Sequence, residues 1–341
     1  MNFFSGTWWL GVQIWRSGCL KYNRVDNGVA FHTFSHSHPA HHMISAWVPN
    51  SSRINRTEHG NNTEHGLHLA TSTQFCGCNG SSCSVDAARV DVEFHDTFIL
   101  IFGCSLDIRA IGYFCHAANG VTMESIVNSA PFSYLASCSV GSVTLAYVFH
   151  PGASPPPYSS EYNPAILGST RDILQRSHHD VMVKFGREPT AIIVDASLWD
   201  ISNWWGKLGR PAYPYPATIA FPYLDQWCNV DVPQLLTDVA TIYPNSAIAF
   251  RTAPTVFGGH DNTGQNPFLV DAMVDCMDHY RDPLGKIYGK FGLIDYHQFV
   301  DTMLQGAGAL GATYYQDSLH PGAGLSLMYM NNVLNWVKLL R

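Results

Sequence analysis

The alternation of short apolar runs with segments of helical spacing constrains the fold of residues 96–341 most strongly. Five runs are short, rich in β-branched and aromatic residues and followed by turn residues, which is typical of buried strands. They are residues 98–102, 144–149, 191–194, 247–250 and 291–294. Segments 166–185, 235–242, 267–280 and 325–340 carry apolar residues at helical spacing. This alternation predicts βαβ units and a mostly parallel sheet of five strands.

The first of these runs ends abruptly at Gly103-Cys104-Ser105. Glycine lets the chain turn sharply because it has no Cβ, and the residues after Ser105 have helical spacing. Ser105 is therefore expected at the carboxyl end of a buried strand and at the start of a helix. Ligands of open α/β sheets bind at that edge, where a helix N-terminus also offers N–H groups to an oxyanion. By itself, such a serine is more often a turn or cap residue.

Asp317 and His320 lie three residues apart near the other end of the chain. This spacing can place the aspartate carboxylate against Nδ1 of the histidine, which fixes the tautomer and leaves Nε2 to take a proton from a hydroxyl. Taken alone, Asp317 could be the N-cap of the last helix and His320 a surface turn residue. Together with Ser105, they favour a serine, histidine and aspartate catalytic site.

These residues give the chain a resemblance to the SGNH/GDSL hydrolase superfamily, and within it to the PC-esterase-like branch. Gly103-Cys104-Ser105 matches the Gly-Asp-Ser block with cysteine in place of the acid, and Asp317–His320 matches the Asp-x-x-His block. Residues 195–200, DASLWD, resemble the middle block. The resemblance implies a three-layer α/β/α, flavodoxin-like domain over residues 96–341. Residues 1–95 are then expected to form a β-rich or irregular N-terminal extension.

The resemblance also implies an activity. Ser105 would be the nucleophile, His320 the general base and then acid, and Asp317 the orienting carboxylate, with no cofactor and no metal. The expected function is a serine esterase that acts through an acyl-enzyme on ester substrates, including O-acetyl groups of a glycan. Two alternatives stay open: an O-acyltransferase of the same fold, and a catalytically inactive module that binds a glycan or a protein.

The oxyanion of such a reaction needs hydrogen-bond donors. The backbone N–H of Ser105 is one candidate and that of Gly152 is another, since the superfamily uses a glycine in the corresponding loop. The superfamily's third donor is an asparagine of the middle block, but the matching residue here is Asp195. An ionised carboxylate would repel an oxyanion, so Trp199 Nε1–H is an alternative donor.

Further residues are candidates for the walls of a substrate cleft. Trp199, Asp200 and Arg251 follow predicted strands, and the aromatic residues at 204–205 and 213–223 could stack against sugar rings. The tract at 211–222, rich in Tyr and Pro, is predicted to be a loop. His260 and Asp261 are a rival base and acid in a glycine-rich loop.

The composition limits the kinds of partner that this protein is expected to bind. The chain of 341 residues has a formal net charge of −7 and no cluster of Lys and Arg, which argues against a nucleic-acid partner. It has no apolar run long enough to span a bilayer. We therefore expect a small-molecule or glycan ester as the partner, and the oligomeric state stays open.

Other features indicate a secreted or lumenal protein. Four N-glycosylation sequons begin at Asn50, Asn55, Asn61 and Asn79, and nine cysteines allow disulfides. The first twenty residues are a poor signal peptide because they lack a basic start and a clean apolar core. A histidine-rich stretch between residues 32 and 68 could bind a metal, but a solvated loop is the simpler interpretation.

Overall fold

A computed structural model describes residues 12–14, 20–22, 75–79, 82–119, 135–157, 168–256, 264–288, 291–307, 314–317 and 319–341. The histidine-rich stretch, the rival residues His260 and Asp261, and the sequons at Asn50, Asn55 and Asn61 lie outside these residues. The possible roles of these residues therefore stay predictions.

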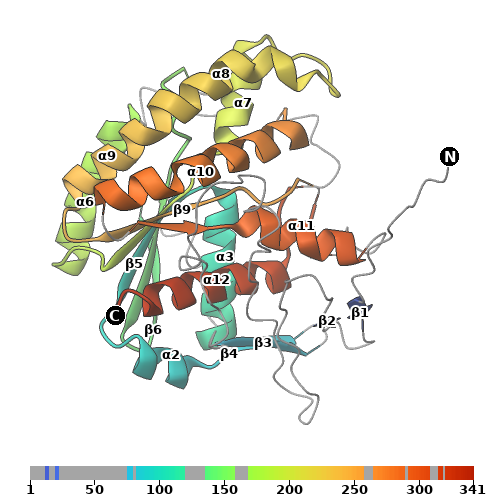
Figure 1. Cartoon of the computed structure of the whole chain (residues 1–341). Helices are drawn as coiled ribbons and strands as arrows, with labels where there is room; N and C mark the ends of the chain where they lie inside the picture. Colours follow the sequence, from blue (N-terminus) through green and yellow to red (C-terminus); the bar gives the residue numbers. More distant parts are fainter. Residues whose placement is uncertain are drawn as a thin grey trace, which may run out of the picture.

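A sheet of six strands forms the centre of the part that the structure describes (Figure 1), in the order β10-β9-β8-β5-β7-β6. Its strands are β5 (Phe98–Gly103), β6 (Ala136–Val140), β7 (Val143–Phe149), β8 (Ala191–Val194), β9 (Ala247–Arg251) and β10 (Phe291–Ile294). All five predicted strands are present and run parallel to one another. Counted along the chain, the parallel strands lie in the order 2-1-3-4-5, which is flavodoxin-like.

The sixth strand, β6, was not predicted. It pairs antiparallel with β7 at the edge of the sheet, and its sequence, ASCSV, has no continuous apolar run. Only Ala136 and Val140 are buried in this strand. Their side chains lie on the face of the edge strand that packs against the core. The predicted five-stranded parallel sheet is therefore correct but is extended by one antiparallel strand.

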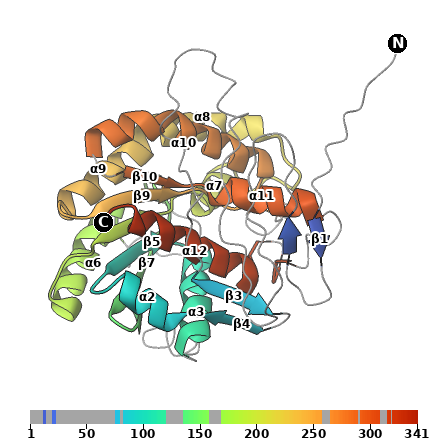
Figure 2. The ribbon, with the colours of Figure 1, turned by 60° about the horizontal axis from the view of Figure 1, so that its bottom comes forward.

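Helices cover both faces of the sheet, as Figures 1 and 2 show, which confirms the three-layer α/β/α fold class. Alternate residues of β5 point to opposite faces. Ile99 and Ile101 belong to one apolar core, whereas Phe98, Leu100 and Phe102 belong to the other. The first core includes residues of α2 (Ala87–Glu93), α3 (Ser105–Asn119), α11 (Tyr296–Ala307) and α12 (Ala323–Lys338). The second includes residues of α6 (Thr170–Phe185), α7 (Leu198–Lys207), α9 (Val232–Ile242) and α10 (Pro267–Tyr288).

Local sequence signals set the ends of α6. The Ser169 side chain accepts a hydrogen bond from the Asp172 N–H, and the Asp172 carboxylate accepts one from the Ser169 N–H, which forms a capping box. Gly186 ends the helix in the left-handed conformation with φ of 67°. These caps explain why the helical segment predicted at 166–185 begins at Thr170 and ends at Phe185.

The tract predicted as a loop at 211–222 is partly helical. A 3₁₀ turn, η2 (Ala217–Ala220), leads directly into α8 (Phe221–Gln226), which continues through the π-helical η3 (Trp227–Asp231) into α9. Proline is tolerated in the first turn of a helix, where its missing N–H has no partner to lose. Pro222 occupies such a position in α8, so this part of the loop prediction was wrong.

The N-terminal region contributes two antiparallel strand pairs, β1 (Val12–Ile14) with β2 (Leu20–Tyr22) and β3 (Cys76–Asn79) with β4 (Ser82–Val85). Phe75 belongs to the same apolar core as α12, and its N–H donates to Asn331 Oδ1 at 3.0 Å. Residues just before 96 thus pack on the α/β layers. The boundary between residues 1–95 and 96–341 stays a prediction.

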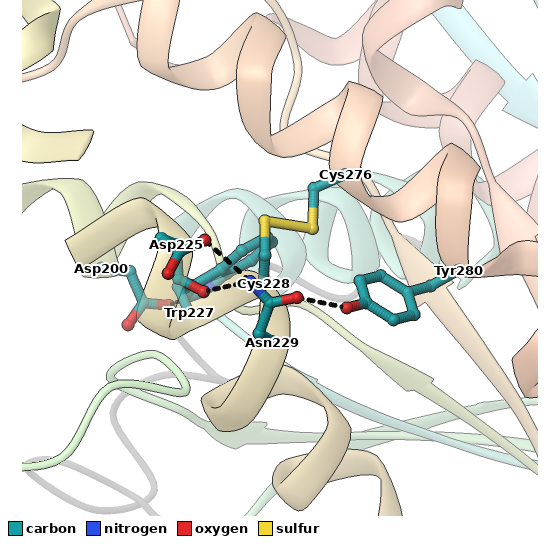
Figure 3. Close-up of a disulfide and its surroundings, with 7 residues drawn as sticks. All are labelled: Asp200, Asp225, Trp227, Cys228, Asn229, Cys276 and Tyr280. Carbon is teal, nitrogen blue, oxygen red and sulfur yellow. Dashed lines mark hydrogen bonds between the residues drawn. A yellow bond between two sulfur atoms is a disulfide. The ribbon is translucent and has the colours of Figure 1, made fainter. Parts of the chain in front are cut away.

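Two disulfides connect elements across the described chain. Cys115 and Cys138 join α3 to the edge strand β6, and Cys228 and Cys276 join η3 to α10. Figure 3 shows the second disulfide beside Trp227 and Asp200. In the described residues, none of the helices combines the length and apolar character needed to cross a bilayer.

Candidate active site

The site is built where β5 ends. This strand lies between β7 and β8, which follow it in the chain but pair on opposite sides of it. Such a switch point opens a crevice at the carboxyl edge of a parallel sheet. Gly103 ends β5, and a Cβ there would lie 2.2 Å from Asp107 Oδ2. Because only glycine fits, Asp107 can fold back and accept the Cys104 N–H at 2.9 Å at the start of α3.

The structure brings the three predicted catalytic residues together. Ser105 Oγ lies 2.9 Å from His320 Nε2, although 215 positions separate the two residues. His320 Nδ1 lies 2.8 Å from Asp317 Oδ2 and 3.0 Å from Asp317 Oδ1. A carboxylate only accepts, so Nδ1 carries the proton and Nε2 is free to accept the serine proton.

The carboxylate of Asp317 is kept ionised by its neighbours. Partial burial alone would raise the pKa of Asp317, but hydrogen bonds from the backbone of His320 and Leu319 and from the His320 ring outweigh that effect, so the pKa lies below its ordinary value. The two backbone bonds measure 2.7 Å and 2.8 Å. They also fold the loop into a tight turn that presents the His320 ring. An ionised Asp317 can therefore stabilise an imidazolium that forms at His320.

A buried ion cluster lies directly after the strand ends, around Arg251. The Arg251 side chain is fully buried and donates to Asp107 Oδ1 at 3.0 Å and Oδ2 at 2.6 Å. Its Nη2 also lies 2.6 Å from Asp195 Oδ2. Tyr329 of α12 adds a hydroxyl that donates to Asp107 Oδ1 at 3.0 Å. This cluster joins the ends of β5, β8 and β9 to the helix that begins at Ser105.

Asp195 is bound by protein groups on both carboxylate oxygens. Oδ2 pairs with Arg251, and Oδ1 accepts from Ser197 Oγ at 2.5 Å. Burial raises the pKa of Asp195 against the lowering effect of the Arg251 charge. The thiol of Cys104 also hydrogen-bonds this carboxylate, and burial raises the pKa of that thiol well above its ordinary range. Asp195 thus has a structural role that the sequence did not predict.

A sulfur and two carboxylates within 4.8 Å of one another could in principle hold a metal ion. They belong to Cys104, Asp107 and Asp195. The guanidinium of Arg251 already pairs with both carboxylates. Its positive charge occupies the place that a cation would take, so this cluster is better described as an ion pair network than as a metal site.

The loop after β7 carries Gly152 to the same edge. Phe149 at the end of β7 pairs with Gly103, and the His150 N–H donates to Gly103 O at 2.8 Å. Gly152 follows with φ of 110°, which is a conformation that favours glycine. Asp200 lies under this loop and accepts N–H bonds from Ala153 and Ser154. Gly152 therefore sits near the N-terminus of α3 by strand register.

The cleft candidates divide into buried and partly exposed residues. Asp200 and Arg251 are fully buried and bonded within the protein, so neither presents its side chain to solvent. Trp199 is half-buried, and its ring contacts Phe149 edge-on with centroids 5.9 Å apart. Trp204, one of the aromatic residues considered for sugar stacking, is also buried, which leaves Trp205 as the partly exposed member of that pair.

His150 is a site residue that sequence reasoning missed. Its ring is buried, and Nδ1 lies 3.2 Å from the carbonyl oxygen of Asp195. A carbonyl only accepts, so Nδ1 carries the proton and Nε2 holds the lone pair. Among the described residues, Nε2 has no hydrogen-bond partner. Burial lowers the pKa of His150 to about 4, so the ring is neutral at pH 7. Its position directly after a strand was the only available signal.

The fold and these distances define a class: a three-layer α/β/α protein with a serine, histidine and aspartate chain at the carboxyl edge of its first parallel strand. No family model matches the chain, and no curated protein matches it. Solved structures that it resembles are described as acylhydrolases and their relatives.

One is a lipase/acylhydrolase from Enterococcus faecalis, with 14% identity, 71% of this chain and 95% of that chain covered, and a TM-score of 0.38. Another is a member of the lipolytic G-D-S-L family from Veillonella parvula, with 13% identity, 70% and 96% covered, and a TM-score of 0.36. A third is LAE5, an α/β hydrolase enzyme from the metagenome of Lake Arreo, with 15% identity, 72% and 96% covered, and a TM-score of 0.39.

Proposed function

We propose that this protein is a serine ester hydrolase that works through an acyl-enzyme on Ser105. The observation that carries the proposal is the continuous hydrogen-bond chain from Ser105 Oγ through the His320 ring to Asp317, with distances of 2.9 Å and 2.8 Å. A serine hydroxyl is a weak nucleophile until a neighbouring base accepts its proton. His320 is that base, and the Asp317 carboxylate holds its ring in the required tautomer.

In the proposed reaction, Ser105 Oγ attacks the ester carbonyl carbon while its proton moves to His320 Nε2. Asp317 stabilises the resulting imidazolium. The tetrahedral intermediate then collapses, and the same proton passes to the departing alcohol, which leaves an acyl group on Ser105. A water molecule then attacks the acyl group and gives its proton to His320. As this second intermediate collapses, the bond to Ser105 Oγ breaks, His320 returns the proton to Ser105 Oγ, and the acid is released. No residue changes its net protonation over the cycle.

The oxyanion of the tetrahedral intermediate is assigned to the backbone N–H groups of Ser105 and Gly152. First-turn amides of a helix have no partner within the helix and lie at its positive end. Each well-placed donor lowers the barrier by roughly 3–4 kcal/mol. The Asp195 carboxylate already binds Arg251 and Ser197. We therefore assign the third donor to a side chain, the Nε1–H of Trp199, rather than to Asp195.

The substrate class follows from the resemblance to the PC-esterase-like branch, which implies O-acetyl groups of a glycan. Partly exposed aromatic side chains at Trp199 and Trp205 support a surface that can stack on sugar rings. A secreted or lumenal location fits the two disulfides Cys115–Cys138 and Cys228–Cys276. An O-acyltransferase would use the same acyl-enzyme and differ only in the acceptor, and an inactive binding module would keep the fold without turnover.

The test compares the wild type with Ser105→Ala, using p-nitrophenyl acetate and an O-acetylated glycan as substrates. We expect turnover to fall by at least about 10³-fold, and a fluorophosphonate probe to label the wild type at Ser105 alone. Equal turnover by the two proteins would refute the proposal. If labelling occurs but water hydrolysis is slow, adding sugar acceptors and measuring transferred acetyl separates an acyltransferase from a hydrolase.

A further inference from the structure

Helix α7 holds the loop that carries Gly152 with side chains one turn apart. Asn203 Nδ2 donates to the carbonyl oxygen of Pro151 at 3.0 Å. Trp204 Nε1 donates to Ser154 Oγ at 3.0 Å. Residues three and four positions apart face the same side of a helix, so Asp200, Asn203 and Trp204 form one surface against residues 151–154. These contacts anchor both ends of the loop.

Asp200 makes the central contact of that surface. Its Oδ2 accepts the Ala153 N–H at 2.9 Å, and its Oδ1 accepts the Ser154 N–H at 2.7 Å. A third donor comes from η3, where Trp227 Nε1 lies 3.0 Å from Oδ2. Figure 3 shows Trp227 reaching Asp200 from the segment that the Cys228–Cys276 disulfide ties to α10.

The carboxylate also packs directly against Gly152. A Cβ on Gly152 would lie 2.6 Å from Asp200 Cγ and Oδ1, closer than real Cβ contacts allow. Gly152 has φ of 110°, so the loop bends around the carboxylate in a conformation that other residues rarely adopt. Two N–H bonds immediately after Gly152 and a close approach at Gly152 itself fix the direction of its backbone.

We propose that Asp200 is a positioning residue that aims the Gly152 N–H at the oxyanion. The proposal rests on the proposed function, because it needs Gly152 to be an oxyanion donor. Hydrogen bonds to an ionised acceptor are shorter and stronger than those between neutral groups, which suits a group that must hold a backbone donor rigidly. A donor that shifts by a fraction of an ångström loses much of its effect on the transition state. Asp200 itself is buried beneath the loop and does not touch the substrate.

The first test compares Asp200→Asn with Asp225→Asn, a matched carboxylate-to-amide change in the same region. Asp225 accepts only from Asn229 in the structure's described contacts and does not reach the loop. For Asp200→Asn we expect kcat to fall by about 10²-fold, as for the loss of one oxyanion donor, while KM changes by less than about threefold. The affinity for a trifluoromethyl ketone transition-state analogue should fall in parallel with kcat. Asp225→Asn should change none of these quantities.

A second measurement does not depend on activity. Hydrogen exchange of the peptide covering residues 151–157 should speed up in Asp200→Asn and not in Asp225→Asn. Unchanged exchange would overturn the positioning role whether or not the protein hydrolyses esters. Faster exchange with an unchanged kcat in an active enzyme would also overturn it. If Asp200→Asn does not fold, Trp227→Phe removes one donor to Asp200 and keeps an aromatic ring; we expect kcat to fall roughly threefold with KM unchanged, and an unaltered kcat would refute the proposal.

Discussion

Arg251 Nη2 lies 2.6 Å from Asp195 Oδ2 at the carboxyl edge of the sheet, at the position where the sequence resemblance led us to expect an asparagine. Cys104 contacts the same carboxylate and stands where the Gly-Asp-Ser block has its acid. We infer that Asp195 supplies at this contact the carboxylate that an aspartate at position 104 would otherwise bring. The Arg251 pairing also neutralises the Asp195 carboxylate, so this residue leaves no free charge beside the proposed oxyanion site.

Swapping the two residues should reveal this coupling. Cys104→Asp alone places a third carboxylate around one arginine, and Asp195→Asn alone removes a partner of Arg251, so each should lower the free energy of unfolding. The double variant restores one carboxylate and one amide. We expect a favourable coupling energy of about 1–3 kcal/mol in a double-mutant cycle measured by urea unfolding. Additive effects would contradict the exchange.

Removing Arg251 should be far more damaging than removing a surface arginine. Arg251→Met leaves Asp107 and Asp195 buried without their cation, and we expect the free energy of unfolding to fall by about 3–5 kcal/mol. Arg187→Met is the control, because Arg187 pairs with Asp96 on the surface and its loss should cost less than about 1 kcal/mol. Urea unfolding of both variants measures the difference, and equal losses would show that the cluster contributes little.

Asp317→Asn should reduce kcat by about 10²–10⁴-fold with little change in stability, because an amide no longer fixes the His320 tautomer or stabilises the imidazolium. Asp271→Asn is a matched control. Asp271 lies 3.1 Å from His297 Nε2, in a second histidine–aspartate pair outside the proposed site. Initial rates of p-nitrophenyl acetate hydrolysis compare the Asp317→Asn and Asp271→Asn variants. Full activity of Asp317→Asn would contradict its role and favour His260 and Asp261 as the base and the acid.

Asp200 and His150 should give opposite pH dependences of stability. Burial raises the pKa of Asp200 from 3.8 to about 6. The resulting contribution of Asp200 to the free energy of unfolding is largest below pH 3.8 and is lost as the pH rises through 6. Burial lowers the pKa of His150 from 6.5 to about 4, so its contribution is present above pH 6.5 and is lost as the pH falls through 4. Each shift corresponds to about 3 kcal/mol.

Between pH 4 and 6 the contributions of Asp200 and His150 change stability in opposite directions. Replacing one of these residues should leave the pH dependence of the other visible. Relative to the wild type, Asp200→Asn should become less stable toward low pH and His150→Asn less stable toward high pH. Urea unfolding at half-unit pH steps measures both difference curves. Difference curves that are flat within about 1 kcal/mol would show that neither group titrates with a shifted pKa.

Gly152→Ala should disturb the oxyanion loop because its Cβ would meet the Asp200 carboxylate at 2.6 Å and its φ is 110°. We expect at least a tenfold loss of kcat and a loss of stability of about 2 kcal/mol or more. Gly186→Ala is the control, since Gly186 has φ of 67° but nothing within 4 Å of a Cβ, and should cost only about 1 kcal/mol with normal activity. Equal kinetic effects would rule out a specific role for residue 152.

The parallel strands were predictable because three of the inner ones, β5, β8 and β9, are buried along their whole length, which requires continuous apolar runs such as residues 98–102. The edge strand β6 has one exposed side and mixes Ser and Cys with its apolar residues, so periodicity did not reveal it. Helical residues 217–226 were hidden by Pro216 and Pro222, which occupy the N-cap of η2 and the first turn of α8. The strand end at Ser105, the spacing of Asp317 and His320 and the family resemblance together predicted that these residues meet at one edge, and the structure brings them within hydrogen-bond distance.

The buried network could not be predicted in the same way. Arg251 was expected at a cleft wall because it follows a predicted strand, yet it is fully buried between two carboxylates. Its partner Asp107 lies 144 positions away, and no local pattern marks such a contact. Asp200 was misplaced for the same reason: three N–H donors from separate segments satisfy its charge in the interior.

The helix that begins at Ser105 packs against α12, and Tyr329 of α12 bonds to Asp107 two residues after the serine. During synthesis on the ribosome, the hydroxyl therefore emerges more than two hundred residues before the imidazole that would arm it. A nascent or truncated chain that ends before residue 317 would lack Asp317, His320 and α12, so Ser105 would have no neighbouring base and α3 would lose the contact of Tyr329 with Asp107. Under the proposed function, the nucleophile therefore stays unactivated until residue 320 has been synthesised and has folded against it.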